Sequence, residues 1–411
     1  METKNFAWPI TAISKENYDV ITGWAHKIER ELGEKQILIF GAGIRGAEIA
    51  VILGTLGIKD IVFTDNNADK WGGNIDGHPI ISVDDALQSK EKYVFLISVE
   101  EGDAICRQLE KSGLKRDKTY FFPKPDFYGN FMEEYKNYTD NGILFLGDCM
   151  FEVVAFDDET KISLKEMLRE KLGDQTKFLT IHGLSAPGFR HMVIGQMNCG
   201  MIPRCIVVML NFETLTGKQH LLPRSQHTPI IKASCECSPD PTGEMHEYLK
   251  TVEERVKNVN AEFFTTSKFS ANKEQNNKAG KISNVAAKMF FKMNYLYSLD
   301  VEMESIRCLK DIMAMAKEKN IMVIPFVPPV NYEHGRELFG EEVFETKYTA
   351  NLNKLRQIVA DEGYELLDLS HICTKKEFAH VTTPDETTNI IGRKLVTEAI
   401  VKELKVKGVI E

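Results

Sequence analysis

GILFLGDCMFEVVAF, residues 142–156, places a run of apolar residues directly before the tripeptide Gly147-Asp148-Cys149. The apolar run has the length of a buried β-strand, and the glycine ends it. A loop that follows such a strand presents its side chains at the edge of a sheet, where open α/β proteins bind ligands. Since the presented side chain is a thiol, the segment raises the question whether Cys149 is a nucleophile.

Further along the chain, strand-length apolar runs alternate with helical patterns. The runs after the first one span residues 178–181, 205–210, 321–326 and 365–367. This alternation predicts a mostly parallel sheet covered by helices on both faces. The carboxyl ends of parallel strands meet at one edge, so we expect Cys149, Gly183 and Asn211 to lie along that edge.

The order and spacing of these strand ends resemble the SGNH (GDSL-type) family of hydrolases and acyltransferases over about residues 143–404. Gly147-Asp148-Cys149 stands where the family has Gly-Asp-Ser, Gly183 aligns with the glycine of the second block, and Asn211 with the asparagine of the third. The resemblance implies a flavodoxin-like, three-layer α/β fold and chemistry on ester bonds. Within the family, the likeness is greatest to the branch of teichoic acid D-alanyl transfer proteins.

The resemblance implies a role for each of these positions. Cys149 is the expected nucleophile, and Gly183 and Asn211 are expected to bind the oxyanion. A thiolate attacks acyl carbons well and depends less on a base than a serine hydroxyl does. The expected substrate is a small molecule or glycan, namely an acylated sugar or a surface-polysaccharide precursor.

The closing block, PDETTNIIGR, departs from the family pattern. It has Thr387 where the catalytic histidine belongs. His380, seven residues earlier, is one candidate for the missing imidazole, with Asp385 to orient it, and His182 is another. If neither serves, the alternative is a catalytically degenerate binding or scaffold protein of a polysaccharide pathway.

The N-terminal part of the chain carries a different pattern. In the stretch from residue 35 to 65, an apolar run leads into Gly41, Gly43 and Gly46, and a second run ends at Asp65. Glycines in this spacing, between a strand and a helix, predict a Rossmann-type domain with a parallel sheet. The backbone then accommodates a pyrophosphate, and Asp65 is placed to bind ribose hydroxyls. The pattern alone leaves an NAD-dependent oxidoreductase as a third functional alternative.

The sequence TDNNADKWGGNIDGHPI, residues 64–80, resembles the small Rossmann-type domains attached to bacterial sugar-modifying and surface-polysaccharide enzymes. This resemblance implies a nucleotide or nucleotide-sugar ligand, or a scaffold role, in place of hydride transfer. We therefore expect a Rossmann-type domain over 1–122, a linker over 123–141, and an SGNH-like domain over 142–411 with an insertion at about 215–300.

Composition restricts the partners and the compartment. The chain has 411 residues and a formal net charge of −9, which disfavours nucleic acid as a partner. Neither a secretory signal nor a run of about 18 apolar residues is present, so we expect a cytoplasmic protein without a membrane span.

Eight irregularly spaced cysteines indicate reduced thiols. A zinc site at Cys235 and Cys237, with His227 or His246, is disfavoured because the usual two-residue gap is missing. The sequence leaves the oligomeric state open.

Overall fold

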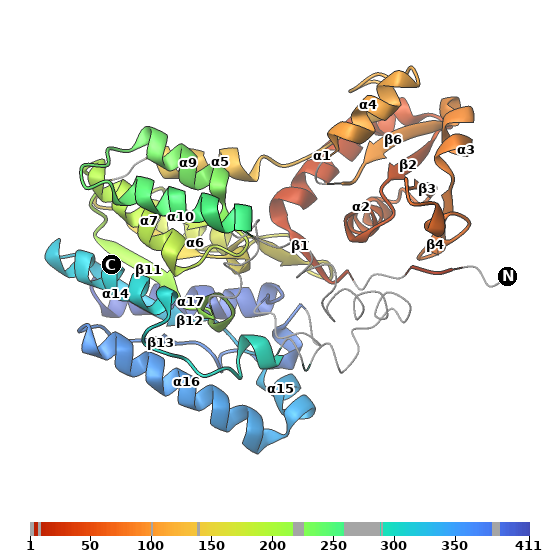
Figure 1. Cartoon of the computed structure of the whole chain (residues 1–411). Coiled ribbons are helices and arrows are strands. Elements are labelled where there is room, and N and C mark those ends of the chain that lie inside the picture. The colour runs from red at the N-terminus through yellow and green to blue at the C-terminus, as the bar shows by residue number, and fades with distance from the viewer. Residues whose placement is uncertain are drawn as a thin grey trace. The chain divides into compact units, whose positions relative to one another are not determined.

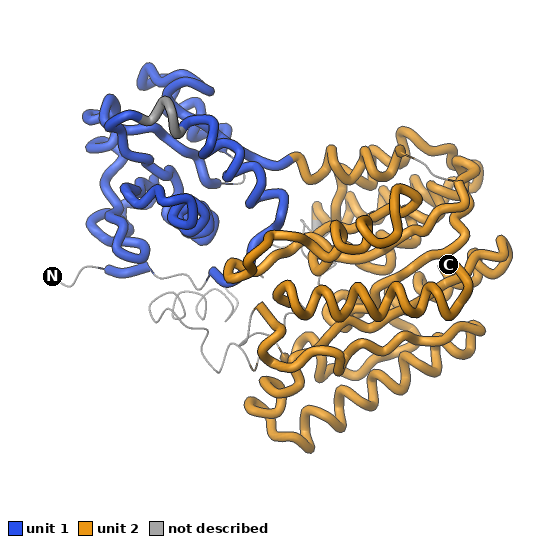
Figure 2. Tube along the Cα trace, turned by 180° about the vertical axis from the view of Figure 1, so that it is seen from behind, with its two compact units in different colours: residues 1–125, 268–282 blue, residues 126–267, 283–411 orange. Residues whose placement is uncertain are grey.

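The computed structural model describes residues 4–6, 10–99, 102–137, 140–216, 226–258, 288, 291–379 and 387–411. It has an α/β fold and divides into two compact units (Figures 1 and 2). The described residues as far as Pro125 belong to unit 1, and those from Asp126 onward belong to unit 2.

Unit 1 contains a mainly parallel sheet. Its parallel strands are β2 (Gln36–Phe40), β3 (Ile61–Thr64), β5 (His78–Ile81), β6 (Tyr93–Ile97) and β7 (Tyr120–Phe121), and the short β4 (Asn74–Ile75) is antiparallel to β5. The order in space is β4-β5-β3-β2-β6-β7. Counted along the chain, the parallel strands run 3-2-1-4-5, which is the order of a doubly wound sheet. Apolar side chains such as Phe40 and Phe95 fill its core.

In the described part of unit 1, four helices accompany this sheet: α1 (Lys15–Leu32), α2 (Ile44–Thr55), α3 (Val83–Gln88) and α4 (Asp103–Lys111). Helix α2 follows β2 directly, with Gly43 as its N-cap residue. The predicted sequence of strand, glycine turn, helix and strand is therefore present in unit 1.

Unit 2 contains a five-stranded sheet in which every neighbouring pair is parallel. The strands are β8 (Ile143–Gly147), β10 (Thr176–Thr180), β11 (Cys205–Met209), β12 (Met322–Val327) and β13 (Leu367–Asp368). They lie in the order β10-β8-β11-β12-β13, or 2-1-3-4-5 along the chain, as in flavodoxin-like sheets. The predicted α/β fold class is confirmed.

Helices surround this sheet (Figure 1). They are α5 (Phe127–Lys136), α6 (Leu164–Leu172), α7 (Ala186–Asn198), α8 (Phe212–Leu215), α9 (Thr228–Cys237), α10 (Glu244–Asn258), α14 (Glu304–Glu318), α15 (Tyr332–Phe339), α16 (Glu341–Asp361) and α17 (Ile390–Val406). Helices α6 and α17 pack together over a core that contains Phe145, Phe178 and Phe326. The expected linker 123–141 contains helix α5. Its apolar residues Phe131, Met132 and Tyr135 are buried, and the helix belongs to unit 2.

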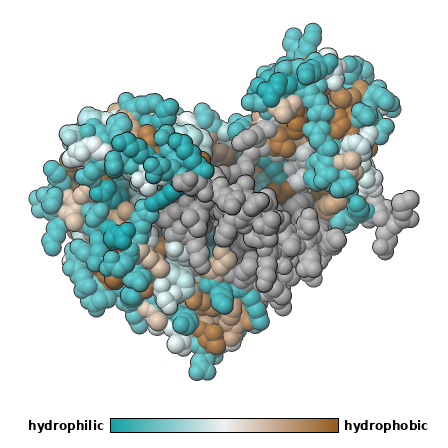
Figure 3. All heavy atoms as spheres, viewed as in Figure 1, coloured by the Kyte–Doolittle hydropathy of each residue, from teal (hydrophilic) through white to brown (hydrophobic). Residues whose placement is uncertain are grey.

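The surface is mostly hydrophilic. In Figure 3, polar residues cover most of the visible, described part of unit 2, and hydrophobic residues form small separate areas. Within the described ranges, no helix combines the length and the apolar character needed to cross a bilayer.

Candidate active site

The carboxyl ends of β8, β10 and β11 bring the candidate residues of unit 2 to one edge of the sheet. Thr180 at the end of β10 pairs with Gly147 at the end of β8, and β11 pairs with β8 on its other side. Neighbouring strands lie about 4.8 Å apart. Cys149, His182 and Asn211, which follow the three strands, therefore leave the sheet at adjacent positions.

Gly147 is needed for the turn that presents Cys149. A Cβ atom at this position would lie 2.3 Å from Cε2 of Phe151, which is fully buried. The Phe151 ring packs against Phe145, Phe178 and Phe326 beneath the strand ends. Only glycine therefore lets the chain leave β8 this close to the aromatic core.

A buried hydrogen-bonded pair joins the ends of β8 and β11. Asn211 Nδ2 donates to Asp148 Oδ2 over 2.9 Å, and both side chains are almost fully buried. Asp148 Oδ1 accepts from the Met150 backbone N–H over 3.0 Å, and Asn211 Oδ1 accepts from the Glu213 N–H over 2.8 Å. Asp148 thus caps the short 3-10 turn of Cys149–Phe151, in which Cys149 is half-buried.

The second predicted element of the edge is the His182-Gly183 turn. Gly183 has a φ of 73°, a left-handed conformation that favours glycine, and Leu184 N–H closes the turn on the Ile181 carbonyl over 3.0 Å. Gly183 is buried and the His182 side chain is exposed. The turn leads into α7, which begins at Ala186.

The closing block is anchored by a buried ion pair that the sequence analysis did not identify. Arg393 is bonded through Nη2 to Asp158 and through Nε to the Ile162 carbonyl, and both charged side chains are 1% exposed. Asp158 Oδ1 accepts from Ile390 N–H over 2.7 Å and so holds the start of α17. Next to this anchor, Thr387 is buried.

His380 and Asp385, which were predicted to supply and orient the missing imidazole, lie outside the described residues. The described residues on either side of them are paired. Ala379 N–H donates to the Thr387 carbonyl over 3.0 Å, and Phe378 forms an antiparallel bridge with Thr388.

A further buried histidine, His227, lies near the His182-Gly183 turn, and the sequence indicated it only as a possible zinc ligand. His227, the residue before α9, is 5% exposed and has a left-handed backbone with a φ of 48°. Its ring lies against the His182 backbone, and burial lowers its pKa to about 4. Within the described structure, neither ring nitrogen has a hydrogen-bond partner, and the same holds for Nε2 of the buried Gln226. The dipeptide Gln226-His227 before an apolar helix does not predict that these side chains are buried.

The disfavoured zinc site is not assembled. His227 precedes α9 and Cys237 ends it, so the two lie about 15 Å apart along the helix. His246 bonds Asp240 over 2.7 Å, and Cys235 packs against apolar residues. Over the described ranges, no three His, Cys, Asp or Glu side chains gather as a metal site.

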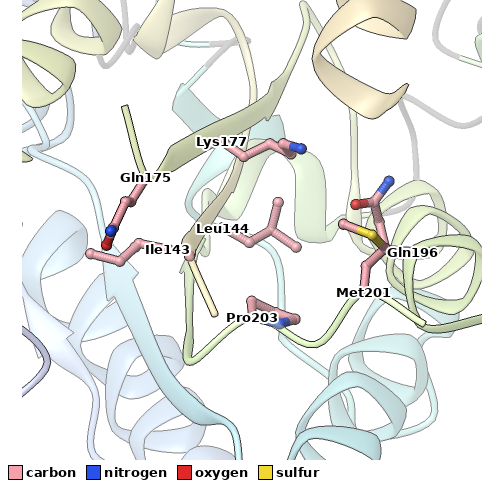
Figure 4. Close-up of a pocket in the computed structure, with 8 residues that line it drawn as sticks. Ile143, Leu144, Gln175, Lys177, Gln196, Met201 and Pro203 are labelled. Atoms are coloured by element: carbon pink, nitrogen blue, oxygen red, sulfur yellow. The ribbon is translucent and has the colours of Figure 1, made fainter. Parts of the chain in front are cut away.

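A pocket lies at the opposite, amino edge of the unit 2 sheet, where β8 and β10 begin (Figure 4). It is lined by Gly142, Ile143, Leu144, Gln175, Lys177, Gln196, Met201 and Pro203. Burial lowers the pKa of Lys177 to about 8. The pocket has none of the predicted catalytic residues, and we assign it no role in the chemistry at Cys149.

In unit 1, two glycines of the predicted motif are required by close packing. Gly41 has a φ of 122°, and a Cβ atom at Gly46 would lie 2.2 Å from the Gly41 carbonyl oxygen. A Cβ atom at Gly43, the N-cap of α2, would meet nothing within 4 Å. The turn is therefore tight at its ends and open at its centre.

Asp65 is used within the protein. Its Oδ2 accepts from Ala42 N–H and from Lys70 Nζ, each over 2.8 Å, and its Oδ1 accepts from Asn67 N–H over 2.8 Å. Lys70 also donates to the Ala42 carbonyl over 2.8 Å. Asp65 and Lys70 thereby fasten the DNNADKWG segment to the glycine turn, and a ribose would compete with these bonds.

Comparisons with known proteins add a family match in unit 1. Residues 33–120 match the family model described as C2185-like, N-terminal. No curated protein matches the chain.

A solved structure described as a GDSL-like lipase, from Parabacteroides merdae ATCC 43184, is 10% identical with a TM-score of 0.33, covering 67% of this chain and 99% of that one. One described as an arylesterase, from Agrobacterium tumefaciens str. C58, is 10% identical with a TM-score of 0.29, covering 66% and 100%. Such low values assign no activity.

Proposed function

We propose that unit 2 is an esterase or acyltransferase of the SGNH type in which Cys149 takes the place of the family's serine. The observation that carries this proposal is the buried bond between Asp148 and Asn211. It joins two strand ends and fixes the turn that presents a half-buried thiol at the carboxyl edge of a flavodoxin-like sheet. A cysteine that only fills space needs no such support.

In this mechanism, Cys149 loses its proton and the thiolate attacks the acyl carbon of an ester. The C–S bond forms, and the carbonyl oxygen becomes an oxyanion. Asn211 Nδ2 has two hydrogens and gives one to Asp148, so the other can serve the oxyanion together with the Gly183 backbone N–H. The C–O bond then breaks, the leaving oxygen takes from solvent the proton that Cys149 released there, and a thioester remains on Cys149.

The substrate in this proposal is an acylated sugar or a surface-polysaccharide precursor, and unit 1 holds a nucleotide or nucleotide-sugar in its glycine turn. The doubly wound strand order and the open position at Gly43 support a ligand there. The internal bonds of Asp65 indicate recognition through the turn backbone rather than through this carboxylate. A rise in melting temperature on adding UDP-glucose, absent with glucose alone, tests this part.

A binding or scaffold role is the second candidate. The observation that favours it is Thr387, which is buried at the position of the family's catalytic histidine. A protein of this kind keeps the fold and binds its ligand at the same edge without turnover.

Ester turnover separates the two candidates. We expect release of p-nitrophenol from p-nitrophenyl acetate by the wild-type protein and its loss in Cys149→Ala. The exposed Cys237→Ala is the matched control and keeps the activity. Equal rates in Cys149→Ala and the wild type, or no turnover by the wild type with any ester tried, would favour the scaffold role.

A further inference from the structure

His227 lies at the same edge of the sheet as Cys149. Helix α9 runs alongside α7 in the same direction, because Ser234 Oγ is 2.7 Å from His191 Nε2 and Asn198 Nδ2 donates to the Pro239 carbonyl over 2.9 Å. The beginning of α9 is therefore next to the beginning of α7. This places His227 over the end of β10, against the His182 backbone.

Neither ring nitrogen of His227 makes a hydrogen bond of ordinary length and angle in the described structure, and the His182 backbone beside the ring offsets only a small part of the effect of burial on its pKa. Buried polar groups are nearly always hydrogen-bonded, and an exception calls for an explanation such as a catalytic role or a missing ligand. Both ring nitrogens of His227 are buried without a partner in the described structure, as is the adjacent amide nitrogen of Gln226. The left-handed backbone of His227 adds strain at the same residue. The three unsatisfied nitrogens thus belong to two consecutive residues, of which His227 lies beside the predicted site.

The other described imidazoles near this edge fit the role less well. His334 follows β12, two strands from β8, and its Nδ1 is 3.0 Å from Glu337 Oε2. His371 follows β13, still further along the sheet, and stacks on Tyr332. His182 follows the neighbouring strand, but its side chain is exposed. His227 is the buried imidazole over the strand next to Cys149.

We propose that His227 is the proton acceptor for the hydroxyl group that attacks the thioester, and so replaces the imidazole missing at Thr387. This inference rests on the proposed function. The oxygen of water or of an acceptor alcohol forms a bond to the acyl carbon while its proton passes to a ring nitrogen of His227. The C–S bond breaks, and the thiolate of Cys149 leaves and takes a proton back from the imidazolium.

The geometry suits this second half-reaction better than direct contact with the thiol. No hydrogen bond joins His227 to Cys149 in this structure, since His227 lies over the end of β10 and Cys149 follows the neighbouring strand β8. In the proposed step, the attacking oxygen lies between the ring of His227 and the acyl carbon on Cys149. Burial keeps the pKa of His227 low, at about 4, so the ring is neutral at pH 7 and offers a lone pair.

Pre-steady-state kinetics with p-nitrophenyl acetate test this role. We expect His227→Gln to release one equivalent of p-nitrophenol per protein in a burst and then to turn over about 100-fold more slowly than the wild type, as expected for loss of a general base. Mass spectrometry should find the acetyl group on Cys149 of this variant. Hydroxylamine, a nucleophile that needs little help from a base, should restore its turnover. His227→Asn should behave in the same way.

His246→Gln, at an exposed histidine of α10, is the matched control and should turn over within a few-fold of the wild type. The inference is overturned if His227→Gln turns over like the wild type, or if the burst and the turnover fall together without rescue by hydroxylamine, which is the pattern of a structural role. Accumulation of acetyl-Cys149 in His182→Gln alone would also overturn it. If the wild type never becomes acetylated at Cys149, the proposed function fails, and the inference fails with it.

Discussion

Asn211 has a structural role in addition to its proposed part in binding an oxyanion. It is the residue that ties the end of β11 to the end of β8 through Asp148. Replacing Asn211 with leucine removes a hydrogen bond from a buried carboxylate, so we expect a loss of about 1–3 kcal/mol in the free energy of unfolding. Urea denaturation measures this loss. In Asn198→Leu, whose amide donates to the Pro239 carbonyl nearer the surface, we expect a smaller loss. Equal losses in the two variants would contradict the role assigned to Asn211.

Arg393 is the second residue on which the architecture of the edge depends. Removal of one partner from a buried ion pair costs about 3–5 kcal/mol, because the other charge stays buried. We expect Arg393→Met to fall in this range and Arg356→Met, which breaks the more exposed pair with Asp368, to cost less than about 1 kcal/mol. A double-mutant cycle with Asp158→Leu should show strong coupling. Additive effects of the two changes would show that the pair does not act as a unit.

At the scale of elements, α7 and α9 are joined by a buried, neutral histidine. Burial lowers the pKa of His191 from 6.5 to about 4. Between these values the unfolded chain binds more protons than the folded one, so stability falls as the pH drops from about 6.5 to about 4 and changes little above 6.5. The shift corresponds to a loss on the order of 3 kcal/mol. His191→Gln should flatten this pH dependence in urea denaturation. An unchanged slope would indicate that other groups cause the acid sensitivity.

The strands that carry the site could be predicted from the sequence. Several of the side chains around the site could not. Apolar runs next to glycine and polar residues are local patterns, so the ends of β8, β10 and β11 could be read directly. The ion pair of Asp158 and Arg393 joins residues 235 positions apart and leaves no local pattern. His227 lies in the expected insertion, where helix α9 had no recognisable partner in the sequence. Its position depends on packing against α7, which only the fold reveals.

At the scale of the whole molecule, the two units have separate cores, so we expect two unfolding transitions in calorimetry. Asp65→Ala removes the acceptor of three hydrogen bonds in unit 1 and should lower one transition only. Arg393→Met should lower the other. A single transition that both variants shift equally would show that the units unfold together.

The central claim is that Cys149 is an activated nucleophile, and the rate of its alkylation tests this most directly. Iodoacetamide should label Cys149 several-fold faster than the exposed Cys237, with each site followed by mass spectrometry in the folded protein. The buried thiols of Cys205 and Cys373, whose pKa values burial raises to about 12, provide the slow reference. Fast, selective labelling of Cys149 is the result that the account predicts. Labelling of Cys149 no faster than that of Cys237 would contradict it.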